Sequence, residues 1–194
     1  MKNTIEVNYM KLCVLFPGVG YTIDKPLLYF SQELATAHGF TVRSVNYQDL
    51  PNIKGLADSD ETKIQAFNMA IKQSEECLSD INWNECTDVI FVGKSIGTVV
   101  AAALAQKLSY DGSIRFVYFT PLSFTFKYAK PASGPVFTGT ADPWVDHAEI
   151  IKKAAELNLP CYTYEKANHS LITGDVTRDI EILKEVFEIV KNEV

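Results

Sequence analysis

The segment Gly93-Lys94-Ser95-Ile96-Gly97 has the G-x-S-x-G spacing that sets a serine on a sharp turn between a strand and a helix. A nearly apolar segment precedes it, and a pattern rich in alanine and valine follows it. The hydroxyl of Ser95 would then lie at a helix N-terminus, where negative charge is stabilised. The spacing predicts a nucleophilic serine, which needs a base to take its proton.

His169 is the best candidate for that base, because it follows the last predicted strand and so lies at the same sheet edge as Ser95. A loop histidine bonded to nearby backbone is the alternative. A neutral imidazole base also needs an acidic acceptor on its second nitrogen. Asp142, which follows the fifth predicted strand and precedes a proline, is the favoured acid. Asp146 competes for this role, but a glutamate three residues later makes a helix capping box the better explanation.

An oxyanion hole needs two N–H donors beside the nucleophile. The amide of Ile96, directly after the serine, is the first predicted donor. The second is expected from the loop after the first strand, with Val19 favoured and Gly20 or Tyr21 as alternatives. Glycines in this loop let the main chain pass close to a ligand. An ordinary glycine turn between strand and helix is the competing interpretation.

Further residues near these loops are candidates for contact with a substrate. Lys94 could attract a carboxylate or phosphate, although a solvated lysine at a turn is the favoured interpretation. Phe124 lies in a segment, residues 121–134, that either walls an apolar pocket or anchors a loop to the core. For Trp144, packing beside the acid loop is the favoured interpretation and contact with the substrate is the alternative. The full set of substrate-binding candidates is Gly18, Gly20, Tyr21, Lys94, Phe124 and Trp144.

The order glycine, lysine, serine at positions 93–95 also occurs in phosphate-binding P-loops. That motif requires G-x-x-x-x-G-K-[ST], and its first glycine would fall at Asp88. The residues between belong to the predicted strand, so no glycine-rich loop encloses a phosphate. A nucleotide-binding protein of this type is therefore disfavoured.

Short apolar segments alternate along the chain with longer amphipathic ones. The predicted strands are residues 12–16, 40–46, 87–92, 114–120, 135–138 and 161–164. The predicted helices are residues 25–38, 59–80, 96–109, 147–158 and 176–191. This alternation is typical of βαβ units around a mostly parallel sheet. We therefore expect a three-layer α/β/α fold of about six strands in a single domain, residues 1–194, with ligands at the carboxyl ends of the strands. An additional edge strand at residues 5–9 is left open.

Composition narrows the function further. The 194 residues include 18 Lys and Arg against 24 Asp and Glu, which gives a formal net charge of −6. This balance argues against nucleic-acid binding and against docking on an anionic membrane, because both need basic surfaces. No apolar stretch approaches the length of a bilayer span, and the N-terminus lacks a signal-peptide pattern. The four cysteines have no metal-binding spacing. We expect a cytoplasmic protein that uses no metal and no organic cofactor.

Together these motifs resemble the α/β-hydrolase family in a small form without a lid. The resemblance covers nearly the whole chain and implies a strand order of 2-1-3-4-5-6 across the sheet. It also implies a serine hydrolase with Ser95 as nucleophile, His169 as base and Asp142 as orienting acid, in the chain order of the family. The first loop departs from the family, since Pro17-Gly18 stands where members often have His-Gly. The segment after the fourth strand is too short for a lid domain.

The resulting hypothesis is hydrolysis of a carboxylic ester or thioester of a small molecule through an acyl-enzyme on Ser95. Amide hydrolysis, or acyl transfer to an acceptor other than water, would use the same three residues. A non-catalytic binding module on the same scaffold is the alternative from another class, because a fold does not determine function.

Overall fold

The computed structural model describes residues 10–51 and 59–194. Within them, six parallel strands form one sheet in the order β2-β1-β3-β4-β5-β6. The strands are β1 (Met10–Phe16), β2 (Thr41–Ser44), β3 (Cys86–Lys94), β4 (Ile114–Phe119), β5 (Val136–Gly139) and β6 (Cys161–Tyr164). The predicted number and order of strands are confirmed, and the sheet is parallel throughout. The edge strand considered at residues 5–9 lies outside the described residues.

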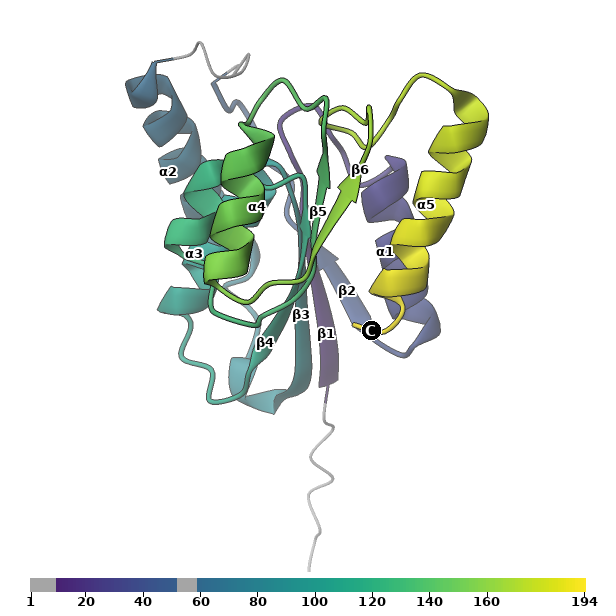
Figure 1. The fold of residues 1–194 in the computed structure, drawn as a ribbon. Helices are drawn as coiled ribbons and strands as arrows, with labels where there is room; N and C mark the ends of the chain where they lie inside the picture. The colour runs from purple at the N-terminus through teal and green to yellow at the C-terminus, as the bar shows by residue number, and fades with distance from the viewer. Residues whose placement is uncertain (1–9, 52–58) are drawn as a thin grey trace, which may run out of the picture.

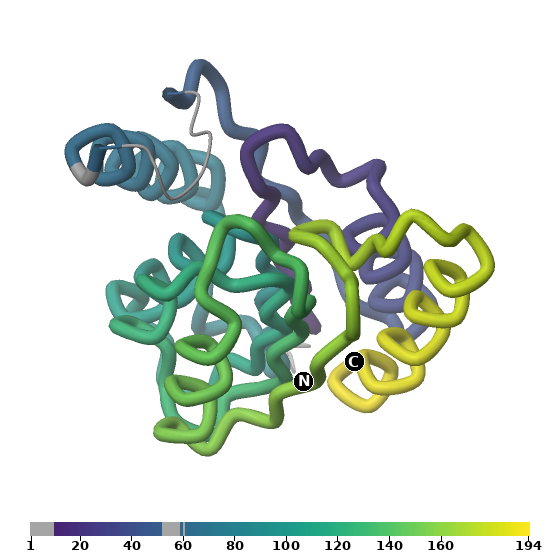
Figure 2. Tube along the Cα trace, turned by 45° about the horizontal axis from the view of Figure 1, so that its top comes forward, coloured from purple at the N-terminus to yellow at the C-terminus, as the bar shows by residue number. Residues whose placement is uncertain are grey.

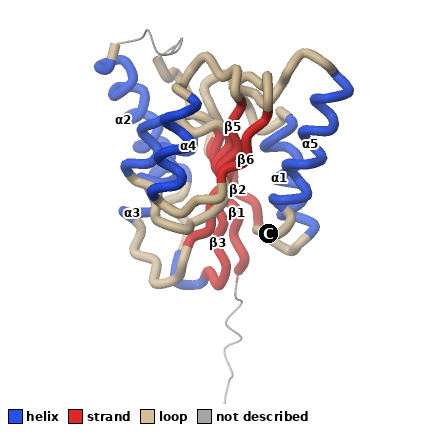
Figure 3. The backbone as a smooth tube through the Cα atoms, in the orientation of Figure 1, coloured by secondary structure: helices blue, strands red, loops and turns tan. Residues whose placement is uncertain are grey.

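Helices cover both faces of this sheet, which confirms the three-layer α/β/α architecture (Figures 1 and 3). One face carries α1 (Pro26–Ala37) and α5 (Val176–Val190). The other carries α2 (Asp60–Cys77), α3 (Ile96–Lys107) and α4 (His147–Glu156). The short 3₁₀ helices η1 (Trp83–Glu85) and η2 (Ser123–Lys127) lie in connecting segments. Among residues 10–51 and 59–194, none of the helices combines the length and the apolar character that a bilayer crossing requires.

The central strands are buried on both faces, so they appear in the sequence as continuous apolar segments. In β3, Val89 and Phe91 belong to the core beneath α2, α3 and α4. Ile90 and Val92 point the other way, into the core beneath α1 and α5. None of the four side chains has exposed surface. The α3 helix is buried over residues 96–105, and it therefore lacks a polar face.

The strand register brings the carboxyl ends of the strands to one level. Phe16 of β1 pairs with Gly93 of β3, and Lys94 of β3 pairs with Phe119 of β4. The loops that follow these strands therefore leave the sheet at the same edge. Figure 2 shows how these loops and those after β5 and β6 converge there. Loops at the carboxyl edge of an open parallel sheet are the usual place for a ligand site.

Candidate active site

Ser95 occupies a strained turn between β3 and α3. Its backbone has φ of 57° and ψ of −124°, a conformation that side-chain-bearing residues rarely adopt. A Cβ on Gly93 would lie 2.7 Å from Cα of Thr98, and a Cβ on Gly97 would lie 2.0 Å from the carbonyl oxygen of Phe16. Both glycines are therefore required by close backbone contacts. The turn is the one that the G-x-S-x-G spacing predicted.

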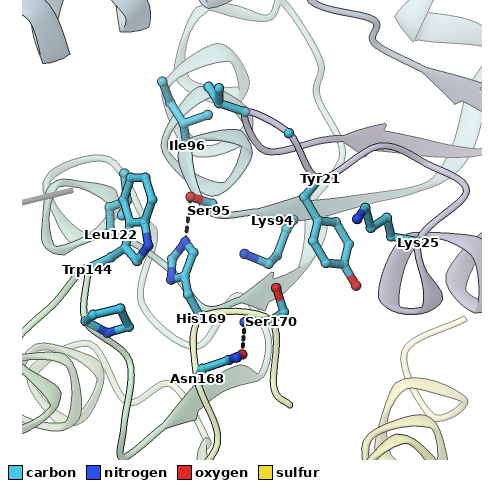
Figure 4. Close-up of a pocket in the computed structure, with 13 residues that line it drawn as sticks. Tyr21, Lys25, Lys94, Ser95, Ile96, Leu122, Trp144, Asn168, His169 and Ser170 are labelled. Atoms are coloured by element: carbon cyan, nitrogen blue, oxygen red, sulfur yellow. Dashed lines mark hydrogen bonds between the residues drawn. The ribbon is translucent and has the colours of Figure 1, made fainter. Parts of the chain in front are cut away.

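His169 joins this serine to an acid from a third loop. Its Nε2 lies 2.8 Å from Oγ of Ser95, and its Nδ1 lies 2.7 Å from Oδ2 of Asp142. Figure 4 shows the imidazole pointing at the serine hydroxyl across the cavity. The Asp142 side chain has no exposed surface, and that of His169 is 14% exposed. The fold thus brings together three side chains that lie in the loops after β3, β5 and β6.

Two further contacts hold the imidazole in place. The hydroxyl of Thr120, directly after β4, donates to the backbone carbonyl of His169 at 2.9 Å. The indole ring of Trp144 stacks on the imidazole, with ring centres 5.2 Å apart and planes inclined by 19°. The backbone N–H of Trp144 also donates to Oδ1 of Asp142 at 2.8 Å. The sequence analysis missed Thr120, although a polar residue at the carboxyl end of an apolar strand is a usable signal.

The protonation of His169 follows from its burial. Desolvation lowers the pKa of the imidazole below its ordinary value of 6.5, and the nearby ammonium of Lys94 lowers this pKa further. The hydrogen bond and the charge of Asp142 oppose this shift, and the net pKa is lowered. At neutral pH the ring is therefore uncharged and can accept a proton from the serine.

Asp146, the competing acid, has a structural role instead. It caps α4, where its side chain accepts the N–H of Ala148 at 2.9 Å. The capping box was predicted to close through Glu149, and this part of the prediction is wrong. The Glu149 carboxylate accepts the hydroxyl of Ser123 at 2.6 Å and pairs with Lys153 at 2.9 Å, because η2 packs against α4 and offers these partners.

The loop after β1 lies against the serine turn. Gly18 and Tyr21 exchange two backbone hydrogen bonds of 3.2 Å, which places Val19 and Gly20 at the tip of a tight turn. A Cβ on Gly18 would lie 3.2 Å from Cβ of Ser95, so this glycine packs behind the nucleophile and does not line the cavity around it. Within the described residues, the amides of Val19, Gly20 and Ile96 have no hydrogen-bond acceptor, whereas that of Tyr21 donates to the carbonyl of Gly18. The first three remain available to an oxyanion.

Lys94 is buried, with 1% of its surface exposed, so the solvated lysine favoured from the sequence is wrong. The reason is that β3 extends two residues beyond its predicted end, and Lys94 pairs with Phe119 inside the sheet. Its ammonium lies 5.0 Å from the centre of the Tyr21 ring. Burial lowers the pKa of Lys94 from 10.5 to about 7.

A cavity of about 310 Å³ surrounds the serine hydroxyl. Four of the substrate-binding candidates line it, namely Gly20, Tyr21, Lys94 and Trp144, together with Lys25 and Leu122, which the sequence analysis did not identify. A larger groove of about 770 Å³ lies beside it and shares Ile96, Leu122 and Trp144 with it. Phe124 is 44% exposed and lines this groove, so it does not wall the cavity around the serine.

Neither a protein-family model nor a curated protein sequence matches this chain. Solved structures do match it. A candidate hydrolase of the alpha/beta superfamily from Xanthomonas campestris pv. campestris shares 15% identity, with 94% of this chain and 99% of that chain covered, at a TM-score of 0.62. A lid-less a/b serine hydrolase from Xanthomonas campestris shares 16% identity, with 98% and 85% covered, at a TM-score of 0.56. An alpha-beta serine hydrolase homologue from Coxiella burnetii shares 16% identity, with 95% and 85% covered, at a TM-score of 0.54.

At such identities the likeness concerns the fold, and function has to be argued from the site. The sheet order, the five flanking helices and the serine turn agree with the resemblance stated from the sequence. In the residues that the structure describes, the connection between β4 and β5 holds only η2 and no lid. The chain therefore has the α/β-hydrolase fold in its small form without a lid.

Proposed function

We propose that this protein is a serine hydrolase that cleaves a carboxylic ester or thioester through an acyl-enzyme on Ser95. One observation carries the proposal: His169 is hydrogen-bonded to Ser95 through Nε2 and to Asp142 through Nδ1 at the same time. This is the arrangement in which an imidazole can take the serine proton while an acid fixes its tautomer. The cavity of about 310 Å³ supports a small-molecule substrate.

In the first step, Oγ of Ser95 bonds to the carbonyl carbon and its proton passes to Nε2 of His169. Asp142 stabilises the imidazolium that forms. The carbonyl oxygen becomes an oxyanion, which the amides of Ile96 and Val19 bind at the N-terminus of α3. When the oxyanion collapses, the bond to the leaving alcohol or thiol breaks, and that group takes the proton from Nε2.

Water then enters, and the same groups work in reverse order. His169 takes a proton from the water, and the resulting hydroxide attacks the acyl carbon. Collapse of the second oxyanion releases the carboxylic acid and returns the proton from Nε2 to Oγ of Ser95. Each step balances with water as the second substrate, and none of them requires a metal or an organic cofactor.

The test is covalent labelling with a fluorophosphonate, which reacts with serines activated by a base. We expect a single labelled residue in the wild-type protein, assigned to Ser95 by peptide mass spectrometry. Ser95→Ala should remove both the labelling and the turnover of p-nitrophenyl esters without unfolding the protein. Ser170→Ala removes the other serine hydroxyl of the cavity wall and serves as the matched control, which should still be labelled.

Three outcomes would contradict the proposal. An unlabelled wild-type protein that cleaves no ester or thioester would indicate a binding module on a hydrolase scaffold. Full ester turnover by Ser95→Ala would show that another group is the nucleophile. Release of the acyl group to an added alcohol or amine in preference to water would indicate an acyltransferase that uses the same site.

A further inference from the structure

Lys94 is an ionisable side chain without a hydrogen-bond or ion-pair partner among the described residues, in the wall of the cavity around Ser95. It is 1% exposed, and among residues 10–51 and 59–194 its ammonium forms neither a hydrogen bond nor an ion pair. The ammonium lies over the face of the Tyr21 ring, 5.0 Å from the ring centre. Burying an ammonium group without a partner is unfavourable. An apolar residue would fill the same space at lower free energy, so the charge needs an explanation outside packing.

The nearest acid does not supply the missing partner. Asp142 attracts Lys94 electrostatically, but both of its carboxylate oxygens already have other partners. Its Oδ2 is 2.7 Å from Nδ1 of His169, and its Oδ1 accepts the N–H of Trp144 at 2.8 Å. Figure 4 shows the ammonium of Lys94 between Tyr21 and the imidazole, in the wall of the cavity that holds the serine hydroxyl. The charge thus faces the space that a substrate would occupy.

The cavity as a whole favours anions although the chain carries a formal net charge of −6. Its lining contains two lysines, Lys25 and Lys94, and no aspartate or glutamate. The Lys25 ammonium lies 6.0 Å from the centre of the same Tyr21 ring that Lys94 contacts. Positive groups along a concave wall concentrate anions in it, even when the rest of the surface is acidic.

Resting on the hydrolase function proposed above, we propose that the substrate carries a carboxylate near its scissile carbonyl, and that the ammonium of Lys94 binds this carboxylate. A carboxylate fits because Lys94 is the buried lysine of the lining and its ammonium balances one negative charge, whereas Lys25 is exposed. The small volume of the cavity, about 310 Å³, keeps the carboxylate within a few bonds of the carbonyl that Ser95 attacks. The substrate class is therefore the half-esters or half-thioesters of short dicarboxylic acids.

The proposal gives Lys94 a role in specificity. Burial lowers the pKa of this lysine to about 7, and a bound carboxylate would favour its protonated form. The buried ammonium would then have the partner that the protein itself does not provide. A neutral ester leaves the ammonium of Lys94 without a partner in the enzyme–substrate complex, and its kcat/KM should be lower for that reason.

The test compares matched p-nitrophenyl esters that differ only at the far end of the acyl chain. The half-esters of succinic, glutaric and adipic acid carry a carboxylate where the butyrate, valerate and hexanoate esters carry a methyl group. The measured quantity is the ratio of kcat/KM for each charged ester to that of its neutral partner, normalised by their spontaneous hydrolysis. We expect the wild-type ratio to exceed one for at least one chain length. Lys94→Met should lower that ratio by about ten- to one-hundredfold.

Lys72→Met is the control, because it removes the same charge from an exposed position on α2, where the side chain of Lys72 is 75% exposed. It should keep the wild-type ratio. Because the readout is a ratio, a general loss of activity in Lys94→Met leaves it unchanged. A wild-type ratio below one at every chain length overturns the proposal, and this arm needs no variant that has to fold.

Calorimetric titration with the corresponding amides separates this proposal from the hydrolase function. Adipamate, the monoamide of adipic acid, should bind the wild-type protein more tightly than hexanamide, and Lys94→Met should lose this preference, even if no ester is turned over. That result would support the carboxylate site while contradicting the hydrolase. Turnover of both esters with the same ratio in Lys94→Met as in the wild type would overturn the carboxylate site and leave the hydrolase intact.

Discussion

Asp142→Asn tests the arrangement of Ser95, His169 and Asp142 more sharply than any deletion. The hydrogen bonds around position 142 determine which way the side-chain amide of the new asparagine must face. Oδ1 of Asp142 accepts the backbone N–H of Trp144 at 2.8 Å, and Oδ2 faces Nδ1 of His169 at 2.7 Å. In the variant only the amide oxygen can accept the N–H of Trp144. The NH₂ group must then face His169 and donate to Nδ1.

This reversal moves the proton of the neutral imidazole from Nδ1 to Nε2. Nε2 would then donate to Oγ of Ser95, 2.8 Å away, and could no longer remove its proton. In a Ser-His-Asp site the wrong tautomer lowers kcat by about 10⁴-fold. At about 1.36 kcal/mol per factor of ten, this corresponds to about 5.4 kcal/mol of lost transition-state stabilisation. Stability should change little, because both hydrogen bonds of residue 142 persist in the variant.

The assay is the steady-state turnover of p-nitrophenyl esters, together with the rate of fluorophosphonate labelling and the melting temperature. Asp146→Asn is the matched control, since Asn caps a helix as well as Asp and, within the described residues, the side chain of Asp146 bonds only to the N–H of Ala148. It should keep nearly wild-type rates. If Asp142→Asn retains turnover within tenfold of the wild type, Asp142 does not set the tautomer of His169, and the reasoning is refuted.

Two further predictions concern the acid limb of the profile of kcat/KM against pH and the turn that holds Ser95. Because burial lowers the pKa of His169, the imidazole stays neutral as the pH falls through 6.5, and kcat/KM should decline only at lower pH. A midpoint at or above 6.5 would contradict this, and Lys94→Met should move the midpoint upward, since the ammonium is one cause of the lowered pKa. Gly97→Ala places a Cβ 2.0 Å from the carbonyl oxygen of Phe16 and should lower the free energy of unfolding by more than about 3 kcal/mol, measured by urea denaturation. Gly20→Ala is its control, because a Cβ at Gly20 meets nothing within 4 Å. This variant should lose only about 1 kcal/mol of unfolding free energy, through the φ of 71° at Gly20. Equal losses in the two variants would show that the contact at Gly97 does not limit stability.

The strands themselves and the serine turn could be predicted because each depends on short-range patterns, whereas the order of the strands across the sheet was implied by the resemblance to the α/β-hydrolase family. Buried parallel strands require continuous apolar residues, which β1 and β3 display. A strand-to-helix turn at positive φ requires residues with almost no side chain two positions before and two positions after the serine. Gly93 and Gly97 occupy these positions. Assignment of His169 and Asp142 was also within reach, since parallel topology brings all loops after the strands to one edge.

The surroundings of Lys94 and Glu149 could not be predicted in the same way. Lys94 follows a glycine and precedes the turn, and from the sequence it is indistinguishable from a solvated lysine. Its burial results from pairing with Phe119 across the β3–β4 register. Glu149 has the right spacing for a capping box, yet η2 supplies a closer partner in Ser123. In both cases the deciding neighbour comes from a distant part of the chain.

By itself, the sequence determined the layers of this protein, the edge of the sheet that holds the site and the serine at its centre. These follow from periodicity and from the steric demands of single residues, which act over a few positions. Only the tertiary structure decided that His169 touches both Ser95 and Asp142, that Trp144 fixes the free oxygen of that acid, and that the ammonium of Lys94 is buried in the cavity wall. Hydrogen bonds and desolvation depend on distances of a few ångströms between residues far apart in the chain, and these distances are set by register and packing.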